Sequence, residues 1–477
     1  MREGIVPQSD REHLGSNGIK PLFEPQSVAV IGSLRQSWFG GYVVVMQLQK
    51  FGFPGKIYPV NPSVEEVLGI KAYPSLESIP GPVDLAIIMT SYRAFPRIIE
   101  ECVEKGVKAG IIVSDGFAER DEERAKLQQE IVKIARRTGL RLIGPNTIGL
   151  HNTANGLMTN PYLLEYEKIY PGSVAIFGQT GLVGPQALPL QDWGYGISKI
   201  CDVGNKCDVD ESDMLEYFGS DPQTKVIAMH LEDVKDGRRF VQTARNVVAQ
   251  KPVLVLKPGK CKESAKAMAS HTGSLAGEDR IYDAALKQAG VIRVDSHVEL
   301  LEYAKIFSHD TPLPSGNKVA IVTFTGGFGV MGIDAAVAAG LTPAELSSDT
   351  MAKLSSIYPT LAKNPVDLGT AMPVADDFEA MYRQVLEIVV NDDNVDCLAI
   401  VNYVALGLGA PDVFIDLKKK TSKPIALWTY SQSLAPLPEL ARTLDQAGIP
   451  VYSKWEHALG ALGAAYKYSL IREKLAT

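Results

Sequence analysis

Short runs of β-branched and aliphatic residues alternate with helix-like segments along most of the chain. In its first third, the strand-like runs lie at residues 27–31, 56–60, 83–89, 109–113 and 141–143. Segments with apolar residues at helical spacing separate them, for example 96–105 and 122–138. Strands that alternate with helices form parallel βαβ units, whose ligand crevice lies at the carboxyl ends of the strands. The sequence therefore predicts an α/β fold built on doubly wound parallel sheets.

Two breaks divide this alternation. Residues 151–171, rich in Asn, Tyr and Pro, are interpreted as a crossover, after which the pattern resumes at 173–177. Residues 311–317, Thr-Pro-Leu-Pro-Ser-Gly-Asn, form the clearest linker and precede a further set of strands from 318. We therefore expect three consecutive α/β domains after a flexible tail, with the tail at 1–20 and the domains at 21–150, 151–312 and 313–477.

Composition excludes several classes of protein. The net charge of −7, without a basic stripe, argues against a nucleic-acid binder. The N-terminal segment lacks the apolar stretch that a secretory signal peptide requires. The chain has no apolar run long enough for a transmembrane helix. The five cysteines are scattered without metal-ligand spacing, which is typical of reduced thiols. We expect a cytoplasmic protein without a structural metal and without a membrane or nucleic-acid partner.

A glycine-containing loop follows the opening strand of the first predicted domain. Only Gly32 follows that strand, so the loop is not GxGxxG, and the second strand ends at Asn61-Pro62 without an acidic residue for a ribose. This disfavours NAD and leaves a nucleotide-like ligand held by backbone N–H groups. A tight turn that simply requires glycine explains the pattern equally well.

The second and third predicted domains open with comparable loops. Gly178-Gln179-Thr180-Gly181 begins a helix-like segment, where exposed N–H groups suit a phosphate. Thr325-Gly326-Gly327 holds the matching place in the third domain. Each loop alone is weak evidence, because ordinary turn chemistry accounts for it. Their equivalent positions strengthen the binding interpretation.

One histidine stands among small residues. His271 lies in Ala-Ser-His-Thr-Gly-Ser-Leu-Ala-Gly, residues 269–277, before a predicted helix at 278–289 that Gly290 stops. Small neighbours leave room for a substrate, and a neutral imidazole is a nucleophile near neutral pH, although a structural role also fits. Glu232 ends a predicted strand, and its carboxylate could orient such an imidazole and stabilise its positive charge.

An acidic cluster in the second predicted domain looks superficially like a cation loop. Asp208, Asp210 and Asp213 lack the glycine and terminal glutamate of a calcium-binding loop. An acidic cap on the helix around 214–218 is the better interpretation. No metal site is expected.

With these residues assembled, the chain resembles the α subunit of NDP-forming acyl-CoA synthetases, the ADP-forming acetate–CoA ligases related to succinyl-CoA synthetase. The resemblance covers residues 20–470. The stretches that carry it are 27–32, 57–62, 144–147, 204–206, 270–277 and 364–368.

The resemblance implies a Rossmann-like CoA-binding domain followed by two flavodoxin-like ligase domains. His271 would be the phosphorylated histidine and Glu232 its stabilising carboxylate. The phosphoryl group would be held by Gln179, Thr180 and Gly181. CoA contacts would come from Gly32, Ser33, Arg35, Asn61, Pro62, Ser114, Asp115 and Asn146.

The implied reaction interconverts acyl-CoA, ADP and phosphate with a carboxylic acid, CoA and ATP, through an acyl phosphate and a phosphohistidine. The family's ATP-grasp domain, which binds ADP or ATP with Mg²⁺, has no counterpart in these 477 residues. A separate β subunit is therefore expected, in an α2β2 assembly. Thr325, Gly326 and Gly327 are candidates for the acyl site, where the bulk of Phe324 and Phe328 suggests an acid other than acetate.

Two alternative functions stay open. A non-catalytic CoA or acyl-CoA sensor would share the first domain, but such sensors typically lack the histidine. An NAD-dependent dehydrogenase is disfavoured by the missing GxGxxG and acidic residue.

Overall fold

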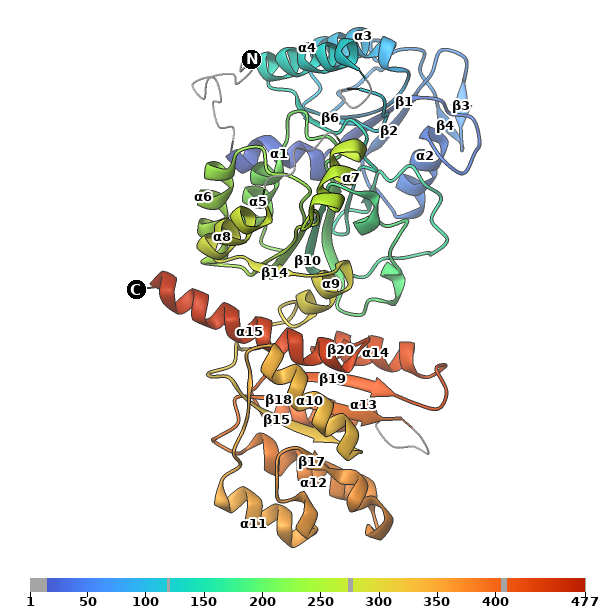
Figure 1. Cartoon of the computed structure of the whole chain (residues 1–477). Coiled ribbons are helices and arrows are strands. Elements are labelled where there is room, and N and C mark those ends of the chain that lie inside the picture. Colours follow the sequence, from blue (N-terminus) through green and yellow to red (C-terminus); the bar gives the residue numbers. More distant parts are fainter. Residues whose placement is uncertain (1–14, 118–120, 273–277, 405–409, 477) are drawn as a thin grey trace.

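The computed structural model describes residues 15–117, 121–272, 278–404 and 410–476, without the side chains of 15–17, 269–272 and 476. Three sheets dominated by parallel pairing succeed one another along the chain, and Figure 1 shows them stacked in chain order from the N-terminal end at the top. The predicted α/β fold class is confirmed. Within the described ranges, no helix combines the length and the apolar composition needed to cross a membrane.

The first sheet is wholly parallel. Its strands, in spatial order, are β2 (Lys56–Val60), β1 (Ser27–Gly32), β5 (Leu85–Met89), β6 (Ala109–Ile112) and β7 (Arg141–Ile143). A separate antiparallel pair, β3 (Glu66–Val67) and β4 (Ile70–Lys71), lies in the excursion after β2. The strands predicted in this region are confirmed, with small differences at their ends. All their carboxyl ends meet at one edge.

The second sheet adds an antiparallel extension to a parallel core. Its order is β14 (Ile292–Val294), β13 (Val253–Leu256), β12 (Val226–His230), β10 (Pro171–Gly178), β11 (Ile197–Asp202), β8 (Leu150–Asn152) and β9 (Leu157–Met158). β8 pairs antiparallel with β11 and β9 with β8. The stretch 151–171 is therefore more than the predicted crossover, because its first residues extend this sheet.

The third sheet repeats the parallel order. It runs β16 (Thr342–Pro343), β15 (Lys318–Thr323), β18 (Cys397–Tyr403), β19 (Ile425–Tyr430) and β20 (Val451–Tyr452), with β17 (Val366–Asp367) also on β15. In each sheet the parallel strand that comes first in the chain, β1, β10 or β15, lies between two later strands. This arrangement places a ligand crevice where the strand order reverses.

Helices cover the sheets on both faces (Figure 1). In the first third they are α1 (Gly15–Phe23), α2 (Gly41–Lys50), α3 (Phe95–Lys105) and α4 (Glu122–Thr138). The second third contributes α5 (Glu211–Ser220), α6 (Gly237–Val248), α7 (Lys262–Thr272), α8 (Asp279–Ala289) and α9 (His297–Lys305). The last third contributes α10 (Gly326–Ala338), α11 (Ser348–Ile357), α12 (Phe378–Val390), α13 (Pro411–Lys419), α14 (Leu437–Gln446) and α15 (Trp455–Ala476). Short 3-10 turns join several of these elements, among them η3 (Gly181–Val183).

The predicted flexible tail of residues 1–20 differs from the structure at its end. Helix α1 begins at Gly15 and buries Ile19, Leu22 and Phe23 completely or nearly so. These apolar residues fall on one helical face, which packs against α5, β7 and β8. The helix therefore lies between the first and second sheets rather than in a free tail (Figure 1).

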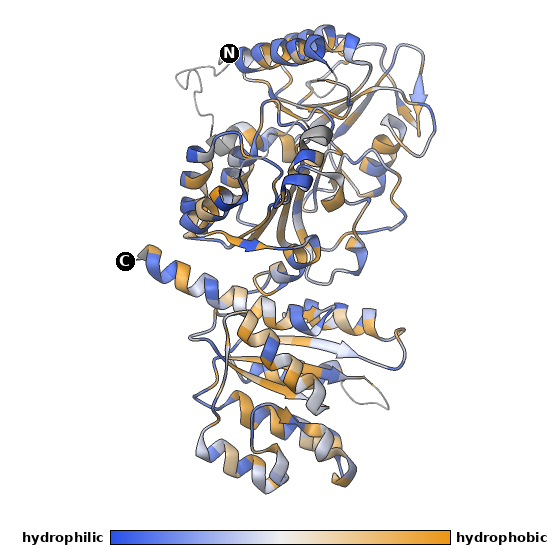
Figure 2. Cartoon of the chain, in the orientation of Figure 1, coloured by the Kyte–Doolittle hydropathy of each residue, from blue (hydrophilic) through white to orange (hydrophobic). Residues whose placement is uncertain are grey.

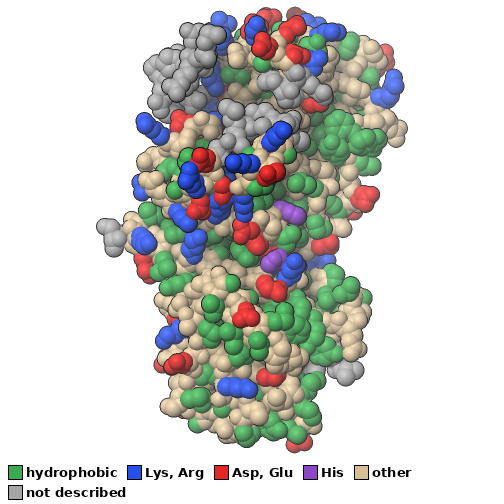
Figure 3. Space-filling view, in the orientation of Figure 1, with side chains coloured by type: hydrophobic (Ala, Val, Ile, Leu, Met, Phe, Trp, Pro, Cys, Tyr) green, Lys and Arg blue, Asp and Glu red, His purple; other side chains and the backbone are tan. Residues whose placement is uncertain are grey.

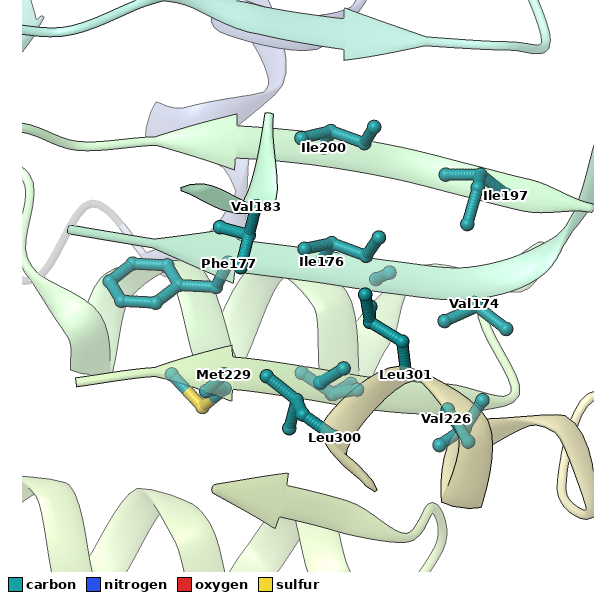
Figure 4. Close-up of a cluster of buried hydrophobic side chains, with 14 of the residues drawn as sticks. Val174, Ile176, Phe177, Val183, Ile197, Ile200, Val226, Met229, Leu300 and Leu301 are labelled. Atoms are coloured by element: carbon teal, nitrogen blue, oxygen red, sulfur yellow. The ribbon is translucent and has the colours of Figure 1, made fainter. Parts of the chain in front are cut away.

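Apolar side chains fill the spaces between the layers. Figure 2 shows hydrophobic strands flanked by helices of mixed polarity, as expected for sheets covered on both faces. At the centre of the second sheet, Ile176, Ile200 and Met229 pack beneath Leu300 and Leu301 of α9 (Figure 4). Acidic and basic side chains are interspersed over the surface of the second domain in Figure 3.

Candidate active site between the first and second domains

The loop after β1 depends on a glycine that no other residue can replace. Gly32 has φ of +139°, and a Cβ there would lie 2.1 Å from the Met89 carbonyl oxygen. The Asn61 side chain donates a hydrogen bond to the Gly32 carbonyl at 2.7 Å and accepts one from the Ser63 N–H at 2.9 Å. The ends of β1, β2 and β5 are therefore locked together at the edge where a ligand crevice is expected.

The ends of β5, β6 and β7 are joined in the same way. The Ser114 hydroxyl donates to the Thr90 carbonyl at 2.7 Å, and the Asn146 N–H donates to the Ser114 carbonyl at 2.9 Å. Asn146 takes a left-handed conformation with φ of +60°. Gly144 precedes it, and a Cβ on Gly144 would lie 2.3 Å from the Ile112 carbonyl oxygen. Close backbone approach thus sets the shape of this edge.

A cleft of about 1320 Å³ opens between this edge and the second domain. Ser114, Asp115 and Asn146 line it from the first domain. The loop Gln179-Thr180-Gly181 lines it from the second. The structure therefore brings three predicted CoA-binding residues to the predicted phosphate loop. The other predicted CoA-binding residues lie at the same sheet edge but do not line the cleft: Gly32 ends β1, and Ser33, Arg35, Asn61 and Pro62 follow β1 and β2.

Gln179 organises the strand end that carries Glu232. Its side-chain oxygen accepts hydrogen bonds from the N–H groups of Glu232 at 2.8 Å and Asp233 at 3.2 Å. Its amide nitrogen donates to the Asp233 carboxylate at 2.9 Å. The side chain of Gln179 is thus committed to this turn. Thr180 caps the following turn η3 through the N–H of Leu182.

A buried ion cluster supports the same turn from below. The Lys206 ammonium lies 2.7 Å from a Glu211 carboxylate oxygen and 2.5 Å from one of Asp233, with the lysine and Glu211 side chains almost wholly buried. Burial would raise the pKa of Asp233, but Lys206 outweighs this and holds the pKa below its usual range. The backbone of Lys206 is left-handed, with φ of +51°. Glu232 itself follows β12 and is 6% exposed.

Asp202 is a cleft residue that sequence reasoning missed. It ends β11, is 3% exposed, and accepts hydrogen bonds from the N–H groups of Ile148 at 2.9 Å and Gly204 at 3.2 Å. Burial raises its pKa to about 6, and the nearby charge of Glu232 adds to the rise. The sequence signal that could have identified Asp202 as a site residue is its position directly after a predicted strand. Functional groups are often found at the carboxyl ends of parallel strands.

His271 lies in the last turn of α7, not in the loop that the small residues predicted. Its side chain and residues 273–277 lie outside the described residues. The predicted pairing of His271 with Glu232 therefore stays a prediction. The helix expected to follow is confirmed as α8, which ends at Ala289 and is capped by Gly290 with φ of +76°.

The third glycine loop is not part of this cleft. Thr325 caps α10 through the N–H of Phe328 at 3.4 Å, with Gly326 and Gly327 beginning the helix. None of the three candidate acyl-site residues, Thr325, Gly326 and Gly327, lines the cleft. Phe324 is 5% exposed and packs against Tyr382, so its bulk serves the core of the third domain.

The acidic cluster that follows β11 is a helix cap. Asp210 accepts hydrogen bonds from the N–H groups of Ser212 at 2.9 Å and Asp213 at 3.1 Å, and the Asp213 carboxylate accepts one from the Asp210 N–H at 3.2 Å. This capping box confirms the prediction for α5. Within the described ranges, no cluster of three His, Cys, Asp or Glu side chains could hold a metal ion.

Comparisons with known proteins match the first and the second domain to two separate family models. Residues 26–153 match the family model of a CoA binding domain, and residues 171–307 match that of a succinyl-CoA ligase like flavodoxin domain.

Full-length relatives extend this similarity over the third domain. The chain is 38% identical to the acetate–CoA ligase [ADP-forming] II subunit alpha of Pyrococcus furiosus, over 95% of this chain and 97% of that one. It is also 38% identical to acetate–CoA ligase [ADP-forming] II of Archaeoglobus fulgidus, over 94% of this chain and 67% of that protein. A solved structure of the dinucleotide forming acetyl-coenzyme A synthetase 1 of Ca. Korarchaeum cryptofilum, in complex with phosphate and ADP, superposes with a TM-score of 0.85 at 29% identity, covering 96% of this chain and 98% of that one.

Proposed function

The chain belongs to the family of ADP-forming acetate–CoA ligase α subunits, and on that basis we propose that it carries the CoA and phosphohistidine half-reactions of an acyl-CoA synthetase. The observation that supports this most directly is the shared cleft. One wall comes from the matched CoA-binding region and the other from the loop Gln179-Thr180-Gly181 of the matched ligase region.

The first proposed step forms an acyl phosphate. A phosphate oxygen attacks the thioester carbon of acyl-CoA, the carbon–sulfur bond breaks, and the CoA thiolate leaves. Ser114, Asp115 and Asn146 would hold the pantetheine arm, and the half-buried loop at Thr180-Gly181 would receive the phosphate. N–H groups fixed before the reaction stabilise charge that develops on phosphoryl oxygens without reorganising.

The second proposed step moves the phosphoryl group to the protein. A ring nitrogen of His271 attacks phosphorus, and the bond to the acyl oxygen breaks, which releases the carboxylic acid as its carboxylate. Glu232 would orient the imidazole and offset the positive charge that forms on it. Gln179 is then a positioning residue, because it fixes the turn that presents Glu232.

The third proposed step requires a partner. The phosphohistidine would pass its phosphoryl group to ADP with Mg²⁺, both held mainly by a β subunit with an ATP-grasp domain, in an α2β2 assembly. Relatives of nearly the same length are named as alpha subunits, which implies a β subunit in those enzymes. The overall reaction would serve a small carboxylic acid and its CoA thioester.

Labelling with radioactive phosphate tests this proposal on the isolated chain. Acyl-CoA and labelled phosphate should give an acid-labile, base-stable label on the protein. His271→Ala should abolish the label, whereas His297→Ala, at an exposed position in α9, should keep it. Glu232→Gln should slow labelling at least about tenfold, the equivalent of about 1.4 kcal/mol, with CoA affinity unchanged.

The negative outcomes separate the alternatives. Binding of CoA without any label would favour a sensor, and a label that persists in His271→Ala would exclude His271 as the acceptor. Unchanged labelling kinetics in Glu232→Gln would remove the proposed role of that carboxylate.

A further inference from the structure

Lys206 is a buried cation near the carboxyl ends of the second sheet, and none of the three proposed steps uses it. Its side chain is 1% exposed and does not line the cleft. An ammonium group has three N–H donors, and the structure supplies three acceptors for them. These are the Glu211 carboxylate at 2.7 Å, the Asp233 carboxylate at 2.5 Å and the Asp233 carbonyl at 2.9 Å. A buried charge that is satisfied so completely holds its neighbours in one arrangement.

The backbone around Lys206 fixes the place of this ammonium. Lys206 lies in the loop after β11 and takes a left-handed conformation with φ of +51°. Before it, the Val203 N–H donates to the Gly178 carbonyl at 3.0 Å. After it, the Cys207 N–H donates to the Gly144 carbonyl at 3.0 Å. The loop is therefore tied both to the end of β10 and to the sheet edge of the first domain.

A single carboxylate oxygen connects Lys206 to Gln179. Oδ1 of Asp233 lies 2.5 Å from the Lys206 ammonium and accepts a hydrogen bond from the Gln179 amide nitrogen at 2.9 Å. Because that nitrogen faces Asp233, the Gln179 amide oxygen faces the N–H groups of Glu232 and Asp233. The carboxylate therefore sets the orientation of the amide, and this orientation is the one that supports the turn at Glu232.

Lys206 is the dominant cation at the Asp233 carboxylate. Burial would raise the pKa of Asp233, but the charge and hydrogen bond of Lys206 hold it below its usual range. Lys235, on the same turn, approaches only to 3.8 Å and its side chain is 44% exposed, so water and salt screen its charge. The other titratable groups around this carboxylate are Lys257 after β13, Tyr282 of α8, Glu211 at the start of α5 and the adjacent Glu232.

From these contacts we propose that Lys206 is a positioning residue for phosphoryl transfer. Through Asp233 and Gln179, it holds Glu232 in a fixed place beside the loop at Thr180-Gly181. This inference rests on the proposed function and adds a residue to its machinery. Lys206 acts at a distance from the reacting atoms, because it keeps one amide in one orientation. The ends of β10 and β12, which carry the two halves of the proposed phosphoryl site, are thereby joined.

Lys206→Met tests the proposal on the full chain, because methionine keeps most of the side-chain length but carries no charge. Labelling by acetyl-CoA and radioactive phosphate should become at least about tenfold slower at saturating acetyl-CoA, since a small misplacement of a reacting group costs that much or more. The half-saturating acetyl-CoA concentration and the CoA affinity should stay unchanged. Amide hydrogen exchange should become faster at Glu232 and Asp233, whose N–H groups donate to Gln179.

Lys199→Met is the matched control. Lys199 is a buried lysine of β11 in the same domain, and its ammonium lies 2.6 Å from the Asp221 carboxylate and 3.3 Å from Gln223, away from the residues that line the cleft. Removing either lysine leaves a largely buried carboxylate without its cation, so both variants should lose stability. Only Lys206→Met should lose labelling rate and exchange protection at Glu232.

The pH dependence separates positioning from a general loss of stability. Without Lys206, nothing outweighs burial and the pKa of Asp233 should rise, so the slowing should be greater at about pH 6 than at about pH 8. Adding Asp233→Asn removes this titrating group and should make the slowing equal at both pH values. Glu211 also loses Lys206 but still titrates in the double variant. A pH difference that persists there would belong to Glu211 and would overturn the connection through Asp233.

The contrary results are distinct from one another. Equal slowing in Lys206→Met and Lys199→Met, or no slowing in either, would overturn the positioning role and leave the proposed function intact. A higher half-saturating acetyl-CoA concentration at an unchanged maximal rate would place Lys206 in thioester binding, which also overturns it. If the natural chain takes no label, the proposed function fails, and hydrogen exchange, which needs no substrate, then decides whether Lys206 fixes the turn. Equal exchange at Glu232 in the natural chain and Lys206→Met would overturn that as well.

Discussion

Asp202 is the side chain in the cleft whose ionisation the fold alters most clearly. Its pKa rises from 3.8 to about 6, first because of burial and then because of the charge on Glu232. The folded chain therefore holds this proton more tightly than the unfolded chain. A raised carboxyl pKa makes the group's contribution to stability fall as pH rises from about 4 to about 6.

Asp202→Asn removes this dependence, because an amide does not titrate in that range. We expect the stability difference between the variant and the natural chain to move in the variant's favour by about 2.4 kcal/mol between about pH 4 and pH 7, because each pKa unit is worth about 1.4 kcal/mol and the unfolded carboxyl is already partly ionised at pH 4. Urea unfolding at both pH values measures it, and contributions from all other groups cancel in the comparison. A difference that stays constant with pH would contradict the raised pKa.

Individual residues show which features of the site the sequence could predict and which it could not. The loop Gln179-Thr180-Gly181 was predicted from its glycines, and the structure places it in the cleft. The hydrogen bond by which the Gln179 side chain supports Glu232 joins the end of β10 to the end of β12. These two residues are 53 positions apart in the sequence. The pairing of Phe39 with Tyr162 is equally long-range. A single sequence carries no signal for such contacts, because tertiary packing decides them.

Elements were more predictable than contacts. Helix α4 and strand β2 occupy the predicted ranges, and β15 begins at residue 318 as predicted, because hydrophobic periodicity and glycine stops are local signals. Strands β8 and β9 were missed within the expected crossover. They are only two or three residues long, and they exist because β11 offers an edge to pair with.

The cap of α5 gives a prediction at the scale of the element. Asp210 satisfies the first N–H groups of this helix, and Arg239 lies 3.2 Å from its carboxylate. Asp210→Ala leaves both the helix N–H groups and the arginine without this partner. We expect a loss of about 1–3 kcal/mol in the free energy of unfolding, measured by urea denaturation.

Asp210→Asn is the matched control, because asparagine caps helices about as well as aspartate. It should retain more stability than Asp210→Ala. If both variants lose the same amount, the ion pair with Arg239 and not the cap is what stabilises α5.

At the scale of the whole molecule, the largest apolar core does not stop at the predicted linker. It extends from the second domain to the face of the third sheet that α15 covers, through residues such as Leu300, Leu459 and Tyr468. Tyr468 also donates a hydrogen bond to the Val248 carbonyl at 3.0 Å. Helix α15 therefore connects the two domains, as its course in Figure 1 shows. A separate core fills the other face of the third sheet.

Glu302 of α9 is the polar centre of this connection. Its carboxylate accepts hydrogen bonds from the Ser453 N–H at 2.9 Å and the Ser453 hydroxyl at 3.0 Å, and it lies 2.5 Å from Nδ1 of His457 in α15. Glu302→Leu leaves the buried His457 imidazole without this partner, at a cost of about 1–3 kcal/mol, and removes both hydrogen bonds to the exposed Ser453. The docking of the third domain on the second should therefore weaken.

Differential scanning calorimetry would reveal this as a change in cooperativity. The natural chain should unfold its second and third domains in one transition, because they share a core and a hydrogen-bonded junction. In Glu302→Leu, a separate transition at lower temperature should appear as the third domain undocks and unfolds first. Glu299→Gln, on the same helix but paired with the Asp295 N–H, should keep the single transition. One transition displaced as a whole in Glu302→Leu would mean that the shared apolar core, without Glu302, suffices to couple the domains.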